Sequence, residues 1–465
     1  VGTGSGCVFQ PMDENSTYIL TAKHLFQNKN QETGKYEEFI VDGCEVPVTF
    51  LEFDGSSWDS TVDNFILRFE ENFFPHPDAD AAVLKIPYRE GYENIHISKT
   101  RGQSSFYLSG FPENLSNQST VSSQYDSEKI NTFLQEDDYF EIAQLNNPIL
   151  NFSEIGGYSG GGIMRFDESE NVFVTGIQSR MAKEKLSLDL GKIGFVPIRY
   201  FEEIIEIYKG QGKLEDLLPL FFKSFRFLSE GIFNMNSGPL EKDREEFLAT
   251  LLISKAGEVT NSNLTPKAIR DFIDKKLLLM SNQDSWHLKR KKIWTLWFEL
   301  LIIINVIKSQ EHSLGDFENL FQKFRVFYSD INSDFFGYHL QDLFKADFTG
   351  LEPDGLVVVA SNVKAQGSLR GVFKFDKIPV NIKEYRNDFV RQKAAEGIFI
   401  NMASDFPYDK YRFTNISTFK EEMLDILDND FFDLPIEDCL PILTAEYEKL
   451  DRKSTRLNSS HLLIS

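Results

Sequence analysis

The stretch Gly157-Tyr158-Ser159-Gly160-Gly161, at the centre of residues 151–162, places one serine between glycines on both sides. A serine hydroxyl becomes an effective nucleophile only when a base removes its proton and nearby donors stabilise the oxyanion that forms. Glycine tolerates positive φ, so the N–H groups of Gly157 and Ser159 can converge on one point. The stretch predicts an acyl-transfer site; the alternative is a glycine-rich turn that carries a solvated serine.

Two stretches upstream supply the partners that such a serine needs. Tyr18-Ile-Leu-Thr-Ala-Lys-His24 is an apolar strand that runs into a histidine, and Asp78-Ala-Asp-Ala-Ala-Val-Leu-Lys-Ile86 places Asp80 before a short apolar strand. In a catalytic triad the histidine acts as general base and the carboxylate fixes its tautomer. We therefore predict His24 as the base, Asp80 as the carboxylate and Ser159 as the nucleophile, with Asp78 as the alternative to Asp80.

With these motifs in the order His, Asp, Ser, residues 1–208 resemble the trypsin-like (chymotrypsin-fold) serine proteases. The Gly2-Thr-Gly-Ser-Gly-Cys-Val-Phe9 opening and the Lys192-Ile-Gly-Phe-Val-Pro197 segment are similar to the bacterial, HtrA-like branch. The resemblance implies an all-β double antiparallel barrel with the active site between the barrels. It also implies an oxyanion hole formed by the N–H groups of Gly157 and Ser159, and a reaction that needs no metal or cofactor.

The resemblance identifies a substrate pocket but no cleavage preference. It puts Ser153 at the pocket base, where trypsin has an aspartate, and Glu154 beside it could supply a negative charge instead. Ser179 and Arg180 would lie along the substrate backbone, and Arg180 or Lys192 could cancel the charge of Glu154.

Tyr158 stands where the digestive enzymes have an aspartate that pairs with a new N-terminus after zymogen cleavage. A tyrosine cannot form that ion pair. Activation by N-terminal trimming is therefore not expected, and any regulation would act elsewhere.

Length and charge limit the remaining possibilities. A chain of 465 residues is longer than one core usually fills. We expect a protease domain at residues 1–208, a mainly helical α+β accessory or sensor domain at 213–450, and a non-native tail at 451–465. The formal charge of −22 disfavours binding to nucleic-acid phosphates. The predicted partners are a protein or peptide substrate and a regulatory protein, with no nucleic acid and no membrane.

The three cysteines, Cys7, Cys44 and Cys439, are too few and too far apart for a disulfide framework. Secreted trypsin relatives usually carry a disulfide beside the catalytic histidine, and no cysteine adjoins His24. Both points favour a reducing, cytoplasmic location and buried single thiols.

The two ends of the chain differ from the natural termini that we expect. The sequence begins at Val1, already with strand character, so we expect natural sequence upstream of it. Residues 451–465 lose the acidic bias and resemble a translated sequencing-adapter tail, so we expect natural sequence to continue past about residue 450.

The second half changes from strand to helix patterns. We predict helices at residues 214–233, 241–254, 265–279, 284–309, 387–395 and 418–427, and strands at 355–360, 371–375 and 379–382. Residues 293–307 are almost all apolar, but a membrane span needs about 20 residues. Because Glu299 and Asn305 also interrupt the run, a buried core helix is the preferred interpretation.

Together these features predict a bacterial serine endopeptidase that acts in the cytoplasm and is regulated by its C-terminal domain or a partner. Two alternatives remain open at this point. The chain could be a catalytically silent interaction module that kept a protease fold. If it is active, it could serve as a defence or stress effector, or in housekeeping quality control.

Overall fold

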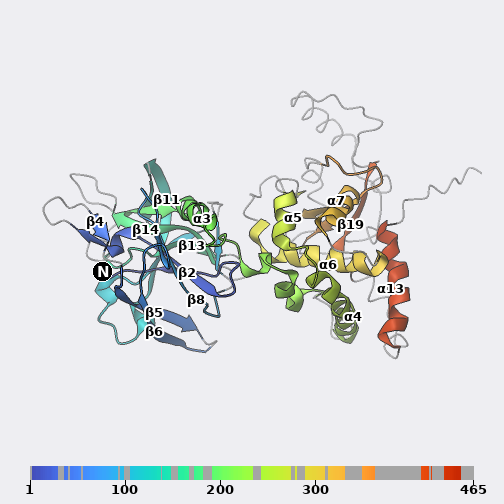
Figure 1. Cartoon of the computed structure of the whole chain (residues 1–465), viewed down its shortest axis with the longest axis horizontal. Helices are drawn as coiled ribbons and strands as arrows, with labels where there is room; N and C mark the ends of the chain where they lie inside the picture. Colours follow the sequence, from blue (N-terminus) through green and yellow to red (C-terminus); the bar gives the residue numbers. More distant parts are fainter. Residues whose placement is uncertain are drawn as a thin grey trace, which may run out of the picture. The chain divides into compact units, whose positions relative to one another are not determined.

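The structure is a computed structural model that describes residues 3–29, 36–39, 42–53, 56–92, 95–98, 105–137, 139–147, 156–166, 172–181, 191–233, 242–273, 278–279, 288–308, 313–329, 348–361, 410–417, 420 and 434–451. The chain forms two compact units, Val1–Leu220 and Phe221–Ser465, and each is described by itself (Figure 1).

The first unit opens with an antiparallel sheet that is buried on both faces. The sheet has the strand order β1 (Cys7–Phe9), β2 (Ser16–Thr21), β8 (Ala82–Pro87), β7 (Phe73–Pro75). Successive side chains of a strand point to opposite faces. In β2, Tyr18 and Leu20 enter one core cluster and Ile19 enters another, which explains why this strand is apolar throughout.

A long hairpin completes the core on the Ile19 side. It consists of β5 (Glu45–Phe53) and β6 (Trp58–Ile66), which lie side by side in Figure 1. Val46 and Phe50 of this hairpin pack in the same cluster as Ile19. A second, short hairpin is formed by β3 (Gln27–Lys29) and β4 (Tyr36–Phe39).

The other half of this unit is a closed antiparallel barrel of six strands. Their order is β13 (Gly162–Phe166), β10 (Phe106–Gly110), β11 (Asp126–Asp137), β12 (Phe140–Leu145), β15 (Lys192–Pro197) and β14 (Val172–Met181), and pairing of β13 with β14 closes the ring. A short strand, β9 (Ile95–Ile97), adds to β14 in parallel. One-turn helices η2 (Glu113–Leu115) and α1 (Val121–Gln124) connect β10 to β11. The predicted all-β antiparallel barrel class is confirmed.

Helix α3 (Arg199–Lys209) follows the last barrel strand and packs against the unit with one face. Phe201, Ile204 and Ile205 are buried in the same cluster as Tyr18. The residues that follow α3 still contact this unit: the Glu215 N–H donates a 2.7 Å hydrogen bond to the Tyr18 hydroxyl.

The second unit is a mainly helical α+β structure, as its sequence predicts. The helices among its described residues include α4 (Lys242–Thr260), α5 (Pro266–Ile273), α6 (Lys291–Lys308), α7 (Leu314–Lys323) and α13 (Ile436–Asp451). Its sheet is parallel, in the order β16 (Leu278–Leu279), β17 (Phe324–Tyr328), β18 (Leu356–Ala360), β19 (Arg412–Asn415).

Several local predictions for this unit differ from the structure. Residues 214–233 do not form one helix; they contain the 3-10 segments η3 (Leu220–Phe222) and η4 (Phe225–Gly231). Residues 221–227 contain four phenylalanines. Phe221 stacks on Phe222 and Phe225 stacks on Phe298, so these rings do not line one face of a single helix. The predicted strands at 371–375 and 379–382 and the helix at 387–395 lie outside the described residues, as does all of 418–427 except Lys420.

The apolar run at residues 293–307 is the core helix α6, and Trp294, Trp297 and Phe298 on it are buried. Among the residues described, no helix has the length and apolar character to cross a membrane. Glu299 is buried in the middle of α6 and lies 2.8 Å from the Lys420 ammonium. It also accepts a hydrogen bond from the Phe233 N–H, so its charge is compensated.

Lys420→Met should destabilise the second unit, because it leaves the Glu299 carboxylate buried without its cation. We expect the free energy of unfolding to fall by about 3–5 kcal/mol. Urea unfolding followed by fluorescence of the buried Trp294 and Trp297 measures it. Adding Glu299→Gln, which removes the charge but keeps an acceptor for Phe233, should restore most of the loss; equal stability of wild type and Lys420→Met would contradict the prediction.

Candidate active site

The pairing of β2 with β8 brings His24 and Asp80 to the same end of the first sheet. Thr21, the last residue of β2, lies opposite Ala82, the first residue of β8. His24 follows β2 in the 3-10 helix η1 (Lys23–Phe26), and Asp80 precedes β8 by two residues. The register therefore forces both residues onto one edge.

The Asp80 carboxylate accepts two hydrogen bonds from His24. Its Oδ1 lies 2.8 Å from the His24 main-chain N, and its Oδ2 lies 2.7 Å from Nδ1 of the ring. The two side chains are 12% and 17% exposed, so water competes little for this contact. An ionised carboxylate can only accept, so Nδ1 carries the proton and Nε2 is left as the basic nitrogen.

A third donor reaches the same carboxylate from the six-stranded barrel. The hydroxyl of Ser179, on β14, donates to Asp80 Oδ2. Burial alone would raise the pKa of Asp80, but the hydrogen bonds from His24 and Ser179 outweigh it and hold the pKa below its usual value. Ser179 lies at a register shift between β14 and β15, an irregularity that redirects a side chain.

Asp78, the alternative carboxylate, is engaged differently. Its main-chain N–H donates to Nδ1 of His76 at 3.1 Å, and its carbonyl faces the Lys23 ammonium. Of the two aspartates, Asp80 is the one that contacts His24.

The loop around Ser159 is held through its carbonyl groups. The Gly156 carbonyl accepts from the Glu113 N–H at 2.6 Å, and the Tyr158 carbonyl accepts from the Gly161 N–H at 2.6 Å. The peptide group is planar and trans, so its N–H points opposite to its C=O. These two bonds therefore fix the directions of the Gly157 and Ser159 N–H groups, the predicted oxyanion donors.

Two glycines of this loop adopt conformations that other residues rarely reach. Gly157 has φ +89° and Gly160 has φ +90°. A Cβ on Gly160 would lie 1.9 Å from the Ser5 carbonyl oxygen, so the loop tolerates no side chain there. The expectation of positive φ around the serine holds at both positions.

The loop is also tied to the strand that supplies Ser179. The Gly160 N–H donates to the Gln178 carbonyl at 2.8 Å, and the Gln178 N–H donates to the Gly161 carbonyl at 2.7 Å. On its other side, a Cβ built on Gly4 would lie 2.7 Å from the Ser159 carbonyl oxygen and 2.5 Å from Leu25 Cδ1. The backbone of Ser159 thus lies beside the residue that follows His24.

Tyr158 is buried and anchors the loop around Ser159 to Asp126 on β11. Its hydroxyl donates to Asp126 Oδ2 at 2.9 Å, and only 1% of the residue is exposed. Burial, reinforced by the Asp126 carboxylate, raises the pKa of Tyr158 far above its usual value, so the phenol stays protonated and remains a donor.

Of the predicted pocket residues, Ser179 and Arg180 are among those that the structure describes. Ser153 and Glu154 lie outside the described residues. The Ser179 side chain is directed to Asp80, and the Arg180 guanidinium stacks on the Phe140 ring with its carbon 3.7 Å from the centroid. Neither contact selects a substrate side chain.

Three residues that the sequence did not single out support the site. Buried Ser5 donates its hydroxyl to the Gly157 carbonyl at 2.8 Å and accepts from the Phe111 N–H at 2.8 Å. Lys23 and His76 form hydrogen bonds to the main chain of the loop that carries Asp80. The only sequence signals were a serine between Gly4 and Gly6, a lysine at an apolar strand end and a histidine between prolines.

Comparisons with known proteins give one family match, to about the second half of the chain. Residues 195–425 match the family model of C-terminal domain 4 of the ABC-three component (ABC-3C) systems. No curated protein sequence matches the chain.

Solved structures similar to this chain include proteases of several kinds. An HtrA-type protease with a decapeptide is 17% identical over 45% of this chain and 52% of its own length, with a TM-score of 0.27. A catalytically inactive tobacco etch virus protease with substrate is 15% identical over 45% and 77%, with a TM-score of 0.26. Kallikrein-related peptidase 10 is 14% identical over 44% and 89%, with a TM-score of 0.25. The chain thus spans about half the length of the HtrA-type protease.

Ser179→Ala should reduce stability in a pH-dependent way. The pKa of Asp80 is depressed in the folded state, so its ionisation stabilises the fold above the unfolded pKa of about 3.9, and this contribution is lost as pH falls through the folded pKa. Loss of one donor should cost about 1–3 kcal/mol near neutral pH. Urea unfolding from about pH 7 to about pH 3 should show the difference narrowing on acidification; a widening difference would contradict it.

Proposed function

We propose that residues 1–208 form a serine endopeptidase domain that cleaves peptide bonds through an acyl-enzyme. The observation that carries this proposal is the 2.7 Å contact between His24 Nδ1 and Asp80 Oδ2, because it leaves Nε2 as a base. The orientation of the Gly157 and Ser159 N–H groups supports it. The mechanism also requires the Ser159 hydroxyl to contact the His24 ring, and we include this contact in the proposal.

In the first step, Ser159 Oγ attacks the scissile carbonyl carbon while His24 Nε2 takes the hydroxyl proton. The carbonyl oxygen becomes an oxyanion, which the Gly157 and Ser159 N–H groups stabilise. The C–N bond then breaks, and the imidazolium returns its proton to the leaving amine. Asp80 stays ionised throughout and stabilises the imidazolium.

In the second step, a water molecule attacks the acyl-enzyme. His24 Nε2 takes the proton of the water, the same N–H groups stabilise the second oxyanion, and the proton passes to Ser159 Oγ as the ester bond breaks. The products are a carboxylic acid and the regenerated serine. Protein groups carry out every transfer of this cycle, so it calls for no metal or cofactor.

A fluorophosphonate probe tests the chemistry directly, because it phosphonylates only an activated serine. We expect wild-type protein to be labelled at Ser159, and Ser159→Ala to remain unlabelled. Asp80→Asn should slow labelling by about 10⁴-fold, since the amide favours the wrong tautomer of His24. Intact-protein and peptide mass spectrometry would locate the adduct.

Asp78→Asn is the matched control, because it alters the neighbouring aspartate and should leave the labelling rate unchanged. Complete absence of labelling under all conditions, with a folded protein, would favour a catalytically silent interaction module.

We further propose that residues 213–450 form an accessory domain that regulates the protease, directly or through a partner protein, in a bacterial defence or stress response. The match of residues 195–425 to a domain of three-component systems supports a role alongside other proteins. Tyr158 cannot form an ion pair with a new N-terminus, and this also favours control by a partner protein.

Regulation of this kind predicts low activity of the isolated full chain on unfolded casein. We expect the rate of casein hydrolysis to rise when the products of neighbouring genes are added, and to stay at zero for Ser159→Ala. High activity of the isolated chain on casein would instead support housekeeping quality control.

A further inference from the structure

The loop from His76 to Asp80 is held on its carbonyl side by a single buried ammonium. Lys23 Nζ lies 2.8 Å from the His76 carbonyl oxygen, 3.2 Å from that of Pro77 and 3.5 Å from that of Asp78. Lys23 is only 9% exposed and directly precedes His24. A charged donor with three carbonyl acceptors fixes the path of this backbone more strongly than neutral bonds would.

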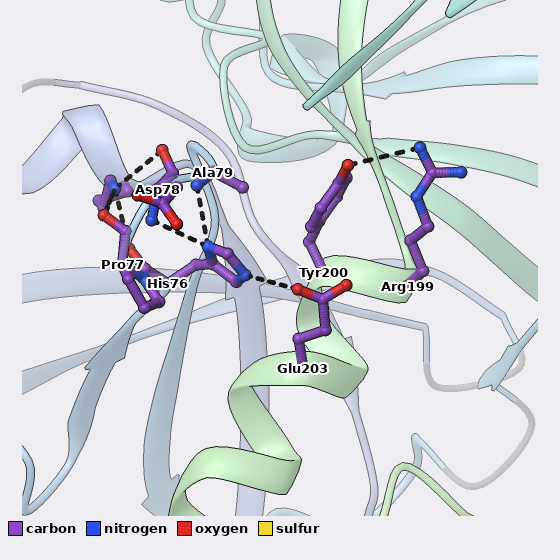
Figure 2. Close-up of polar contacts among 8 residues, drawn as sticks. His76, Pro77, Asp78, Ala79, Arg199, Tyr200 and Glu203 are labelled. Atoms are coloured by element: carbon purple, nitrogen blue, oxygen red, sulfur yellow. Dashed lines mark hydrogen bonds and ion pairs between the residues drawn. The ribbon is translucent and has the colours of Figure 1, made fainter. Parts of the chain in front are cut away.

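The same loop is held on its amide side by the ring of His76. Nδ1 lies 3.1 Å from the Asp78 N and 2.8 Å from the Ala79 N, and it accepts both N–H groups. Nε2 lies 3.0 Å from Oε2 of Glu203, on helix α3 (Figure 2). Because Nδ1 accepts two bonds, the ring proton is on Nε2 and is donated to Glu203.

Helix α3 therefore determines where the His76 ring lies. Beside the bond to Glu203, the Tyr200 ring meets His76 edge to face, with centroids 5.5 Å apart (Figure 2). The Glu203 side chain is 54% exposed, so its charge contributes little energy. Its effect is geometric: Glu203 fixes the orientation of the His76 ring, and the ring in turn fixes the Asp78 and Ala79 N–H groups next to Asp80.

We propose that Lys23, His76 and Glu203 are positioning residues for Asp80, so that α3 controls whether this carboxylate meets His24. The inference rests on the proposed peptidase function. It also identifies α3, from which the chain continues toward the second unit, as the element whose displacement would switch the protease off.

Fluorophosphonate labelling of the full chain tests the inference. Glu203→Ala removes the acceptor from an exposed position, and we expect about a 3- to 10-fold slower labelling, the effect of one hydrogen bond. Glu203→Gln keeps an acceptor oxygen and should label within about twofold of wild type. Glu206→Ala removes another exposed carboxylate from the same helix and should have no effect.

A double-mutant cycle separates positioning from a general loss of structure. If Glu203 acts through Asp80, then Glu203→Ala should have no further effect in an Asp80→Asn background. A loss of the same size in both backgrounds would overturn the inference. His76→Asn gives a second check, because Asn can accept the loop amides but cannot reach α3, so it should resemble Glu203→Ala.

A readout that needs no activity separates failure of this inference from failure of the peptidase proposal. The hydrogen-bonded His24 Nδ1 proton should give a far-downfield NMR resonance, assigned by its loss in His24→Ala. We expect it to broaden in Glu203→Ala and persist in Glu203→Gln, whether or not Ser159 is labelled. Its persistence in Glu203→Ala, or its absence from wild type, would overturn the inference, while labelling of Ser159 alone decides the peptidase proposal.

Discussion

Burial of the Asp80 carboxylate is the constraint on which the first unit depends. An ionised carboxylate removed from water costs several kcal/mol unless donors replace its hydration. The donors come from two different parts of the unit: the main chain and ring of His24 follow the first sheet, and the Ser179 hydroxyl comes from the closed barrel. Satisfying one charge thus aligns the two halves of the unit with each other.

The nucleophile loop obeys a second constraint of the same kind. Every carbonyl from Gly156 to Ser159 has a donor, and two of those donors belong to Ser5. Since peptide planes are rigid, fixing the carbonyls also fixes the amides on the opposite side. The positive φ of Gly157 and Gly160 is the local conformation that this arrangement requires, and it explains why glycines flank Ser159.

Elements whose local residue pattern agrees with their place in the fold are predictable from the sequence. The barrel strands β10, β12, β14 and β15 alternate or run apolar and could be predicted, as could the buried helix around Glu299, whereas the largely polar β11 and the short β13 could not. The β17 and β19 strands could not, because phenylalanine and arginine in Phe324–Tyr328 and Arg412–Asn415 match no clear period. His76 was missed for a different reason: its role depends on Glu203, which is 127 residues away and close only in the fold.

The bond between Tyr158 and Asp126 bears on how such a site could be controlled. A protonated phenol and a carboxylate form this bond without any new N-terminus, so the loop around Ser159 is already anchored in the intact chain. A switch must then act on another part of the site. The loop of Asp80 differs from the nucleophile loop in one respect. The His76 ring that holds its amides is itself positioned by Glu203 on α3, a helix near the end of the unit. The Asp80 loop is held in part through one half-exposed hydrogen bond to a terminal helix, and we expect that part of its support to be lost at lower cost than the bonds to the four carbonyls of the nucleophile loop.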